Sequence, residues 1–258
     1  MARPTRNSRA LSQNFLADRA TAEQLARLAV PHGEQSPLLL EVGAGKGALT
    51  ERLAPRCREL RAYEIDRRLV PLLRDRFSAA PQVTVISGDF LAAKPPRTPF
   101  SVAGNVPFSR TAAIVDWCLR APVLTDATLL TQLEYARKRT GDYGSWTLLT
   151  ILSWPRHDWR LVGRVARTRF RPVPRVDAGV IRIERRRTPL LAPAAHDSWR
   201  HLVELGFSGV GGSLYASLRR AHPRRRVDAA FRAAGLDPHV LVGEVPPGRW
   251  LRLHAALS

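Results

Sequence analysis

A short apolar run that ends in a glycine-rich turn constrains the fold more than any other feature of this sequence. Residues 38–42 are apolar except for Glu41, residues 43–47 contain three glycines, and residues 48–53 carry apolar side chains at helical spacing. This succession is typical of a buried strand, a tight turn and a helix. Similar units recur at 59–77, 83–89, 100–119 and 127–139. The sequence therefore predicts an α/β fold, Rossmann-like, with a parallel sheet covered by helices on both faces.

The C-terminal third of the chain follows a different pattern. Segments 159–168 and 179–185 alternate like antiparallel strands, which we expect to close one edge of the sheet. Beyond a proline- and alanine-rich stretch near residues 188–196, apolar residues recur at helical spacing. We therefore expect two domains, an α/β domain over residues 1–188 with a basic N-terminal arm and a small helical domain over residues 189–258.

The charge of the chain predicts a polyanionic partner. Lys and Arg number 41 against 22 Asp and Glu, which gives a net charge of +19, and only three of the basic residues are lysines. The forked guanidinium of arginine suits phosphate, so nucleic acid is the expected partner, although a solvated surface in an arginine-biased chain would give the same composition. The candidate RNA-binding residues lie between the predicted edge strands: Arg160, Arg164, Arg167, Arg169, Arg171 and Arg175. The run from Arg219 to Arg226 is a second candidate surface, and we favour the first.

Other classes of protein are excluded by what the sequence does not contain. No apolar run approaches the ~20 residues that cross a bilayer, and no apolar segment follows the N-terminal arginines as in a secretory signal. We expect a cytoplasmic monomer that does not contact a membrane. The histidines and the two cysteines lack metal-ligand spacing, so no metal is expected.

The residues that follow the first three predicted strands indicate a nucleoside-containing cofactor. Gly43 and Gly45 let a ligand approach the backbone closely, and Glu64, about 20 residues further on, is placed to accept hydrogen bonds from ribose hydroxyls. Asp89 is placed to accept from an adenine amine. The first loop lacks the spacing of a phosphate-binding P-loop, which argues against an NTPase. These residues alone do not separate NAD from S-adenosylmethionine.

The loop after the fourth predicted strand favours methyl transfer to an exocyclic amine. The lone pair of such an amine is delocalised into its ring, so the nitrogen is a poor nucleophile until acceptors change its geometry. The Asn105 side chain and a backbone carbonyl near Val106 and Pro107 are the candidate acceptors, and Phe108 is the candidate platform for an extruded base. A dehydrogenase has no need of such a loop.

Six ordered motifs make the chain resemble the ribosomal RNA adenine-N6 methyltransferases. They cover nearly the whole chain and lie at residues 13–16, 41–47, 63–66, 88–90, 104–108 and 170–177. Within that superfamily the chain is similar to the Erm branch, which modifies 23S ribosomal RNA and confers macrolide, lincosamide and streptogramin B resistance. The small-subunit KsgA branch typically has Pro-Gly-Leu-Gly at positions 44–47 and Asn-Ile-Ser-Thr at 109–112, where this chain differs.

The resemblance implies S-adenosylmethionine as cofactor and a role for each motif residue. Asn14 and Leu16 would close over the cofactor, while Gly43 and Gly45 would face its methionine moiety. Glu64 would hold its ribose and Asp89 its adenine. Asn105 would face both cofactor and target, and Phe108 and Phe170 would sandwich the flipped adenine. The family more often has tyrosine at position 108 and Asp-Ser at 177–178, and stacking survives the first change.

Two alternatives remain open at this point. One is KsgA-like dimethylation of small-subunit RNA adenines. The other is a non-catalytic RNA-binding or transcription factor on the same fold, against which the intact Glu64, Asp89 and Asn105 argue.

Overall fold

The computed structural model describes residues 15–209 and 213–258. Its strands are β1 (Phe15–Leu16), β2 (Leu39–Val42), β3 (Leu60–Glu64), β4 (Val83–Ser87), β5 (Phe100–Asn105), β6 (Leu124–Gln132), β7 (His157–Val165), β8 (Phe170–Arg171) and β9 (Ala178–Arg185). Its α-helices are α2 (Arg19–Ala29), α3 (Ala48–Leu53), α4 (Val70–Arg76), α5 (Thr111–Arg120), α6 (Leu133–Thr140), α7 (Leu148–Ser153), α8 (His196–Gly206), α9 (Leu214–Leu218), α10 (Arg224–Ala234) and α11 (Pro247–Leu257). Short 3-10 helices include η2 (Phe90–Ala92), η3 (Phe108–Arg110) and η4 (Arg167–Arg169).

The main sheet has seven strands in the order β4-β3-β2-β5-β6-β9-β7. Strands β2 to β6 pair in parallel, and β9 is antiparallel to β6. The predicted α/β fold and the closing of one edge by the last two strands are therefore confirmed. From β2 the next strands along the chain, β3 and β4, lie on one side, and β5 and β6 lie on the other, so the strand order reverses between β2 and β5. Open α/β sheets bind their ligands at such a switch point.

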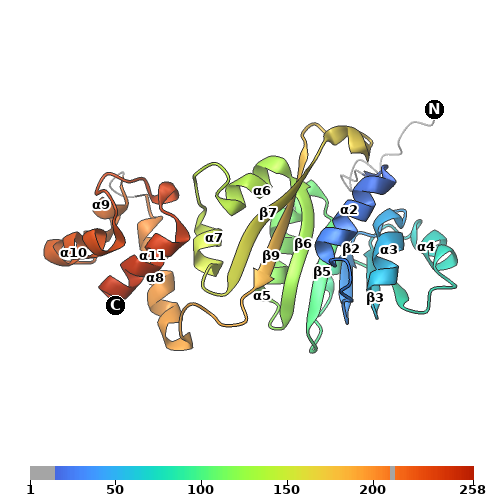
Figure 1. Cartoon of the computed structure of the whole chain (residues 1–258), viewed down its shortest axis with the longest axis horizontal. Coiled ribbons are helices and arrows are strands. Elements are labelled where there is room, and N and C mark those ends of the chain that lie inside the picture. The colour runs from blue at the N-terminus through green and yellow to red at the C-terminus, as the bar shows by residue number, and fades with distance from the viewer. Residues whose placement is uncertain (1–14, 210–212) are drawn as a thin grey trace. The chain divides into compact units, whose positions relative to one another are not determined.

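Helices cover both faces of this sheet, as the burial of its strands requires (Figure 1). On one face, α2 and α3 pack Leu25 and Leu53 into a core with Leu39 of β2. On the other face, Trp117 of α5 contacts the rings of Phe90 and Phe100. Burying both faces fixes the register of each strand, and therefore which residues emerge at its carboxyl end.

A separate two-stranded sheet holds the start of the described chain. β1 pairs antiparallel with β8, with Phe15 opposite Arg171 and Leu16 opposite Phe170. The Ala17 N–H continues this pairing by donating to the Arg169 carbonyl at 3.0 Å. The pairing joins Phe15 and Leu16 of the first motif to Phe170 and Arg171 of the last motif.

The described chain forms two compact units. One contains residues 15–136 and 160–185, and the other contains residues 137–159 together with the described residues from 186 onwards. The second unit has its own core, in which Trp250, Phe231 and Leu218 are buried together with Ile151 of α7. The predicted division into an α/β domain over residues 1–188 and a helical domain over residues 189–258 stays a prediction.

Candidate functional site

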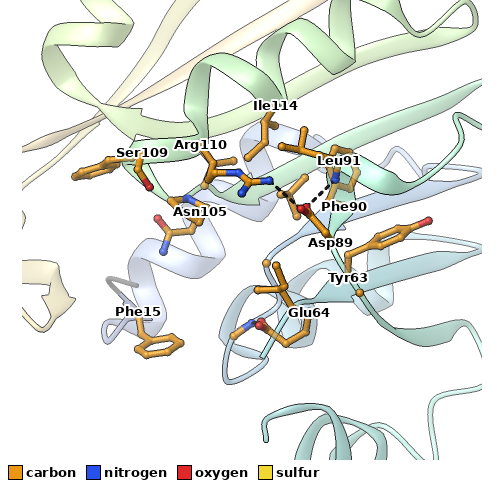
Figure 2. Close-up of a pocket in the computed structure, with 18 residues that line it drawn as sticks. Phe15, Tyr63, Glu64, Asp89, Phe90, Leu91, Asn105, Ser109, Arg110 and Ile114 are labelled. Atoms are coloured by element: carbon orange, nitrogen blue, oxygen red, sulfur yellow. Dashed lines mark hydrogen bonds and ion pairs between the residues drawn. The ribbon is translucent and has the colours of Figure 1, made fainter. Parts of the chain in front are cut away.

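A cavity of about 150 Å³ lies at the carboxyl ends of the parallel strands, within the first unit. Its lining includes six of the candidate cofactor and catalytic residues: Gly43, Gly45, Glu64, Asp89, Asn105 and Phe108. Figure 2 shows several of these side chains around the opening, together with Phe15, Tyr63 and Arg110.

The first loop forms one wall of this cavity because its glycines adopt left-handed backbone angles. Gly43 has φ 71° and Gly45 has φ 59°, a region that residues with a Cβ rarely adopt. A Cβ on Gly43 would meet no atom within 4 Å, whereas one on Gly45 would come within 3.0 Å of the Phe15 ring. The loop therefore leaves open space at Gly43 and is packed tightly under Phe15 at Gly45.

Glu64 connects the loops that follow β2 and β3. It is 1% exposed, and its carboxylate accepts hydrogen bonds from the Gly45 N–H at 2.6 Å and from the Asp66 N–H at 2.7 Å. A carboxylate has about four acceptor sites, so each oxygen keeps one further site for a ligand hydroxyl. Glu64 therefore shapes the glycine loop in addition to facing the cavity.

Asp89 caps η2 and pairs with an arginine of the neighbouring loop. Its Oδ1 accepts from the Leu91 N–H at 3.0 Å, and its Oδ2 lies 2.8 Å from the Arg110 guanidinium. The dashed lines in Figure 2 mark both contacts. The ion pair connects the loop after β4 with the loop after β5.

The loop at residues 105–110 is held by backbone contacts. The Val106 N–H donates to the Leu130 carbonyl of β6 at 3.2 Å, and the Pro107 carbonyl accepts from the Arg110 N–H at 2.9 Å. Because the Pro107 carbonyl is engaged, the Val106 carbonyl is the better candidate acceptor for a target amine. Asn105 and Phe108 are half-buried at this loop, and Phe108 packs against the same apolar core as Phe170.

A second, smaller cavity lies under the glycine loop and is lined by a residue that the motif pattern did not single out. Glu41 of β2 is 1% exposed and lines this cavity together with Phe15, Lys46 and Asn105. Burial raises the pKa of its carboxyl to about 7, with the charge of Glu64 adding to the effect and Thr50 opposing it. Its Oε2 has no hydrogen-bond partner among the described residues.

The signal for Glu41 was present in the sequence as an acidic residue inside an otherwise apolar strand. A buried carboxyl at that place costs free energy unless it has a function or a partner. Phe15 was missed for another reason. Its ring covers Gly45 and lies 5.5 Å from the Lys46 ammonium, contacts that join segments far apart in the sequence.

Three further predicted site residues are not among those that line the larger cavity. Asn14 is outside the described residues. Leu16 lines the smaller cavity rather than the larger one. Phe170 is fully buried in the apolar core and lines neither cavity, so its stacking on a target base stays a prediction that requires the ring to become accessible.

All six arginines predicted to bind RNA are exposed, but several have partners within the protein. Arg160 pairs with Glu184, and Arg169 lies 3.4 Å from Asp18. Arg167 donates to the Arg175 carbonyl at 3.2 Å. In the second patch, Arg226 donates to the carbonyls of Leu257 and Ser258.

Two further properties of the described residues bear on other classes of site. Within 15–209 and 213–258, no cluster of three or more His, Cys, Asp or Glu side chains is arranged to hold a metal ion. Nor does any helix in that part of the chain have the length and apolar character needed to span a bilayer.

Comparison with known proteins identifies the family. The family described as ribosomal RNA adenine dimethylase matches residues 5–258. The chain belongs to this family. Of similar proteins, an rRNA adenine N-6-methyltransferase of Streptomyces fradiae is 63% identical over 98% of this chain and 79% of its own length. The mycinamicin-resistance protein MyrB of Micromonospora griseorubida is 39% identical over 95% of this chain and 77% of its own.

A solved structure supports the same assignment. The crystal structure of the 23S rRNA methyltransferase ErmE has a TM-score of 0.90, with 48% identity over 95% of this chain and 99% of that one. This member of the ribosomal RNA adenine dimethylase family is therefore a methyltransferase of the Erm branch, and the resemblance inferred from the six motifs is confirmed.

Proposed function

We propose that this enzyme transfers a methyl group from S-adenosylmethionine to the N6 amine of an adenine in 23S ribosomal RNA, and so confers macrolide, lincosamide and streptogramin B resistance. The observation that carries the proposal is the convergence of Glu64, Asp89 and Asn105 on one cavity at the switch point of the sheet. The similarity to the 23S rRNA methyltransferase ErmE and to the mycinamicin-resistance protein supports the large-subunit target and the resistance.

The residues present fit S-adenosylmethionine. Bound there, this cofactor supplies an electrophilic methyl group on a sulfonium. Gly43 leaves the space that a Cβ would fill, Asp89 and Glu64 offer acceptors for an amine and for ribose hydroxyls, and the unpartnered Glu41 Oε2 lines the cavity under the glycine loop. A carboxyl at that position suits the ammonium of the methionine moiety. Leu16 lines the same smaller cavity, and we propose that it and Asn14 close over the cofactor.

The target adenine is then bound by the loop at 105–110. The Asn105 side-chain oxygen and the Val106 carbonyl accept the two amine protons, which draws the nitrogen lone pair out of conjugation and towards the methyl group. Phe108 supplies a ring face for the extruded base, worth on the order of 1–3 kcal/mol. Because these acceptors are preorganised by the backbone contacts of the loop, they need little rearrangement as charge develops. The methylated amine loses its proton to solvent.

The experiment that tests this function is methylation of ribosomal RNA with labelled cofactor. Large-subunit and small-subunit RNA are incubated separately with the enzyme, and the modified base is mapped by primer extension and mass spectrometry. We expect label at an adenine N6 of large-subunit RNA. Label only in small-subunit RNA would favour the KsgA-like alternative, and absence of label with intact RNA binding would favour a non-catalytic factor.

A matched variant connects the label with the site. Asn105→Ala should lower the single-turnover rate by about 10²–10³, the loss typical of removing one preorganised polar group, with a smaller change in RNA affinity. A rate within twofold of the parent would refute the role of Asn105.

A further inference from the structure

The ion pair between Asp89 and Arg110 lies at the cavity proposed to bind the cofactor. Both residues line that cavity, and their charged groups are 2.8 Å apart (Figure 2). The Asp89 side chain is 37% exposed and that of Arg110 is 48% exposed. An ion pair with this exposure changes an equilibrium by about fivefold at most, so a ligand can displace it readily.

Both oxygens of Asp89 already have a partner, so an adenine amine that binds this carboxylate shares an oxygen with a donor that is already there. Asp89 caps η2 by accepting the Leu91 N–H on Oδ1, and its Oδ2 accepts from the guanidinium. If Asp89 receives the adenine amine of S-adenosylmethionine, as in the proposed function, the amine approaches from the cavity side where the guanidinium lies. Binding of the cofactor therefore weakens the contact of Asp89 with Arg110.

Among the described residues that line this cavity, Arg110 is the one with a positively charged side chain. It ends the short helix η3 that begins at Phe108, the proposed platform for the extruded base. A base that stacks on Phe108 brings its own phosphates to the rim of the same loop. A guanidinium is well suited to bind phosphate through its forked donors.

We propose that cofactor binding releases Arg110 from Asp89, and that the freed guanidinium binds a backbone phosphate beside the target adenine. This inference rests on the proposed function. It makes Arg110 a positioning residue through which the cofactor site and the RNA site are coupled. Because coupling is reciprocal, RNA should increase cofactor affinity by the same factor that cofactor increases RNA affinity.

The test measures RNA binding as a function of salt concentration, with and without saturating S-adenosylhomocysteine, which prevents turnover. The probe is the RNA fragment found to carry the label in the methylation experiment. For the unmodified enzyme, S-adenosylhomocysteine should tighten RNA binding by up to about fivefold, the limit set by the ion pair. It should also steepen the slope of the logarithm of the binding constant against the logarithm of salt concentration by roughly 0.7–0.9, the change for one added phosphate contact.

Variants at the two residues separate release from a permanent contact. Arg110→Gln should lose both effects of S-adenosylhomocysteine, and its affinity for S-adenosylhomocysteine without RNA should rise by up to about fivefold, because the competitor for Asp89 is gone. Arg110→Lys keeps the charge and should retain the steeper salt dependence. Asp89→Asn should show that steeper dependence without any cofactor.

Arg120→Gln is the matched control. Arg120 lies at the far end of α5 from Arg110 and forms a similar exposed ion pair with Asp116 at 2.7 Å. Its removal should leave the effects of S-adenosylhomocysteine unchanged.

Two results would overturn the inference. If Arg110→Gln flattened the salt dependence equally with and without S-adenosylhomocysteine, the phosphate contact would be permanent. If Arg110→Gln left the salt dependence unchanged both with and without S-adenosylhomocysteine, Arg110 would not bind phosphate. Either result would leave the proposed function intact if the unmodified enzyme still bound RNA and methylated it. Failure of the unmodified enzyme to bind S-adenosylhomocysteine would overturn both the proposed function and this inference.

Discussion

Replacement of Glu41 by glutamine should remove a specific pH dependence from the stability of this protein. Burial raises the pKa of the Glu41 carboxyl from 4.5 to about 7 in the folded chain. Between these two values the folded state holds a proton that the unfolded state has released. The free energy of unfolding therefore falls as pH rises through this window, and the fall is complete above the folded-state pKa.

The size of the effect follows from the two pKa values. A carboxyl with these values contributes about 3 kcal/mol to the free energy of unfolding. This contribution is fully present below the pKa of the unfolded state and is lost above the pKa of the folded state. Between about pH 5 and about pH 8 the loss amounts to roughly 2.5 kcal/mol. Glutamine has nearly the same shape and stays neutral, so the stability of Glu41→Gln relative to the parent should rise by that amount across the interval.

Urea unfolding of both proteins at several pH values measures this difference, and subtracting one profile from the other cancels the other titrating groups. The control is Glu59→Gln, because Glu59 forms an exposed ion pair with Arg61. Its relative stability should change by well under 1 kcal/mol over the same interval. Parallel profiles for the parent and Glu41→Gln would refute the reasoning, since they would mean that Glu41 ionises alike in the folded and unfolded chains.

Three further changes test the site and its surroundings. Phe108→Ala should weaken RNA binding by about 1–3 kcal/mol, whereas Phe108→Tyr keeps the ring face and should be nearly silent in the same binding assay; equal damage would make this a packing position. Replacing Arg164, Arg167 and Arg169 together by glutamine should flatten the slope of the logarithm of the RNA-binding constant against the logarithm of salt concentration by about 0.7–0.9 per lost phosphate contact. The same replacement of Arg224, Arg225 and Arg226 should flatten it less, and the reverse order would assign RNA binding to the helical unit. Gly104→Ala should lower the free energy of unfolding in urea by about 1–3 kcal/mol, because the new Cβ would lie 2.6 Å from the Val42 carbonyl oxygen. Gly248→Ala is the control and should not lower it, because a Cβ at that position meets nothing within 4 Å.

The parts of the fold that were predictable from sequence are those in which local pattern and tertiary environment agree. Strands buried on both faces appear as largely apolar runs, so β2 and β5 could be recognised together with the polar residues at their carboxyl ends. The glycine loop was recognisable because few residues other than glycine tolerate the angles seen at Gly43 and Gly45. Asp89, Glu64 and Asn105 follow from the same argument, because each ends a strand or comes shortly after one.

The rest depended on contacts between distant segments. The Asp89–Arg110 pair and the packing of Phe15 on Gly45 have no periodic signature. The role of Phe170 is implied by the family resemblance alone, whereas burial is decided by the surrounding core, and that core encloses the ring completely. Residues 137–159 fall within the predicted α/β domain, yet Ile151 of α7 is buried with the C-terminal helices, because an apolar helix face packs wherever a complementary face exists.

The net charge of +19 overstates the number of phosphates that this protein can bind at once. Many guanidinium groups have partners within the chain. Arg182 donates to the Leu28 carbonyl, Arg226 donates to the last two carbonyls of the chain, and Arg160 pairs with Glu184. A guanidinium with a carbonyl or carboxylate partner contributes to the long-range field that attracts RNA, but releases a counterion from the RNA only when it turns to a phosphate. The salt dependence of binding therefore counts the arginines that contact phosphate in the complex, including those that leave a partner within the chain to do so. Arg110 is the one whose present partner is also the proposed acceptor for the cofactor, which is why the salt dependence should respond to S-adenosylhomocysteine at that residue.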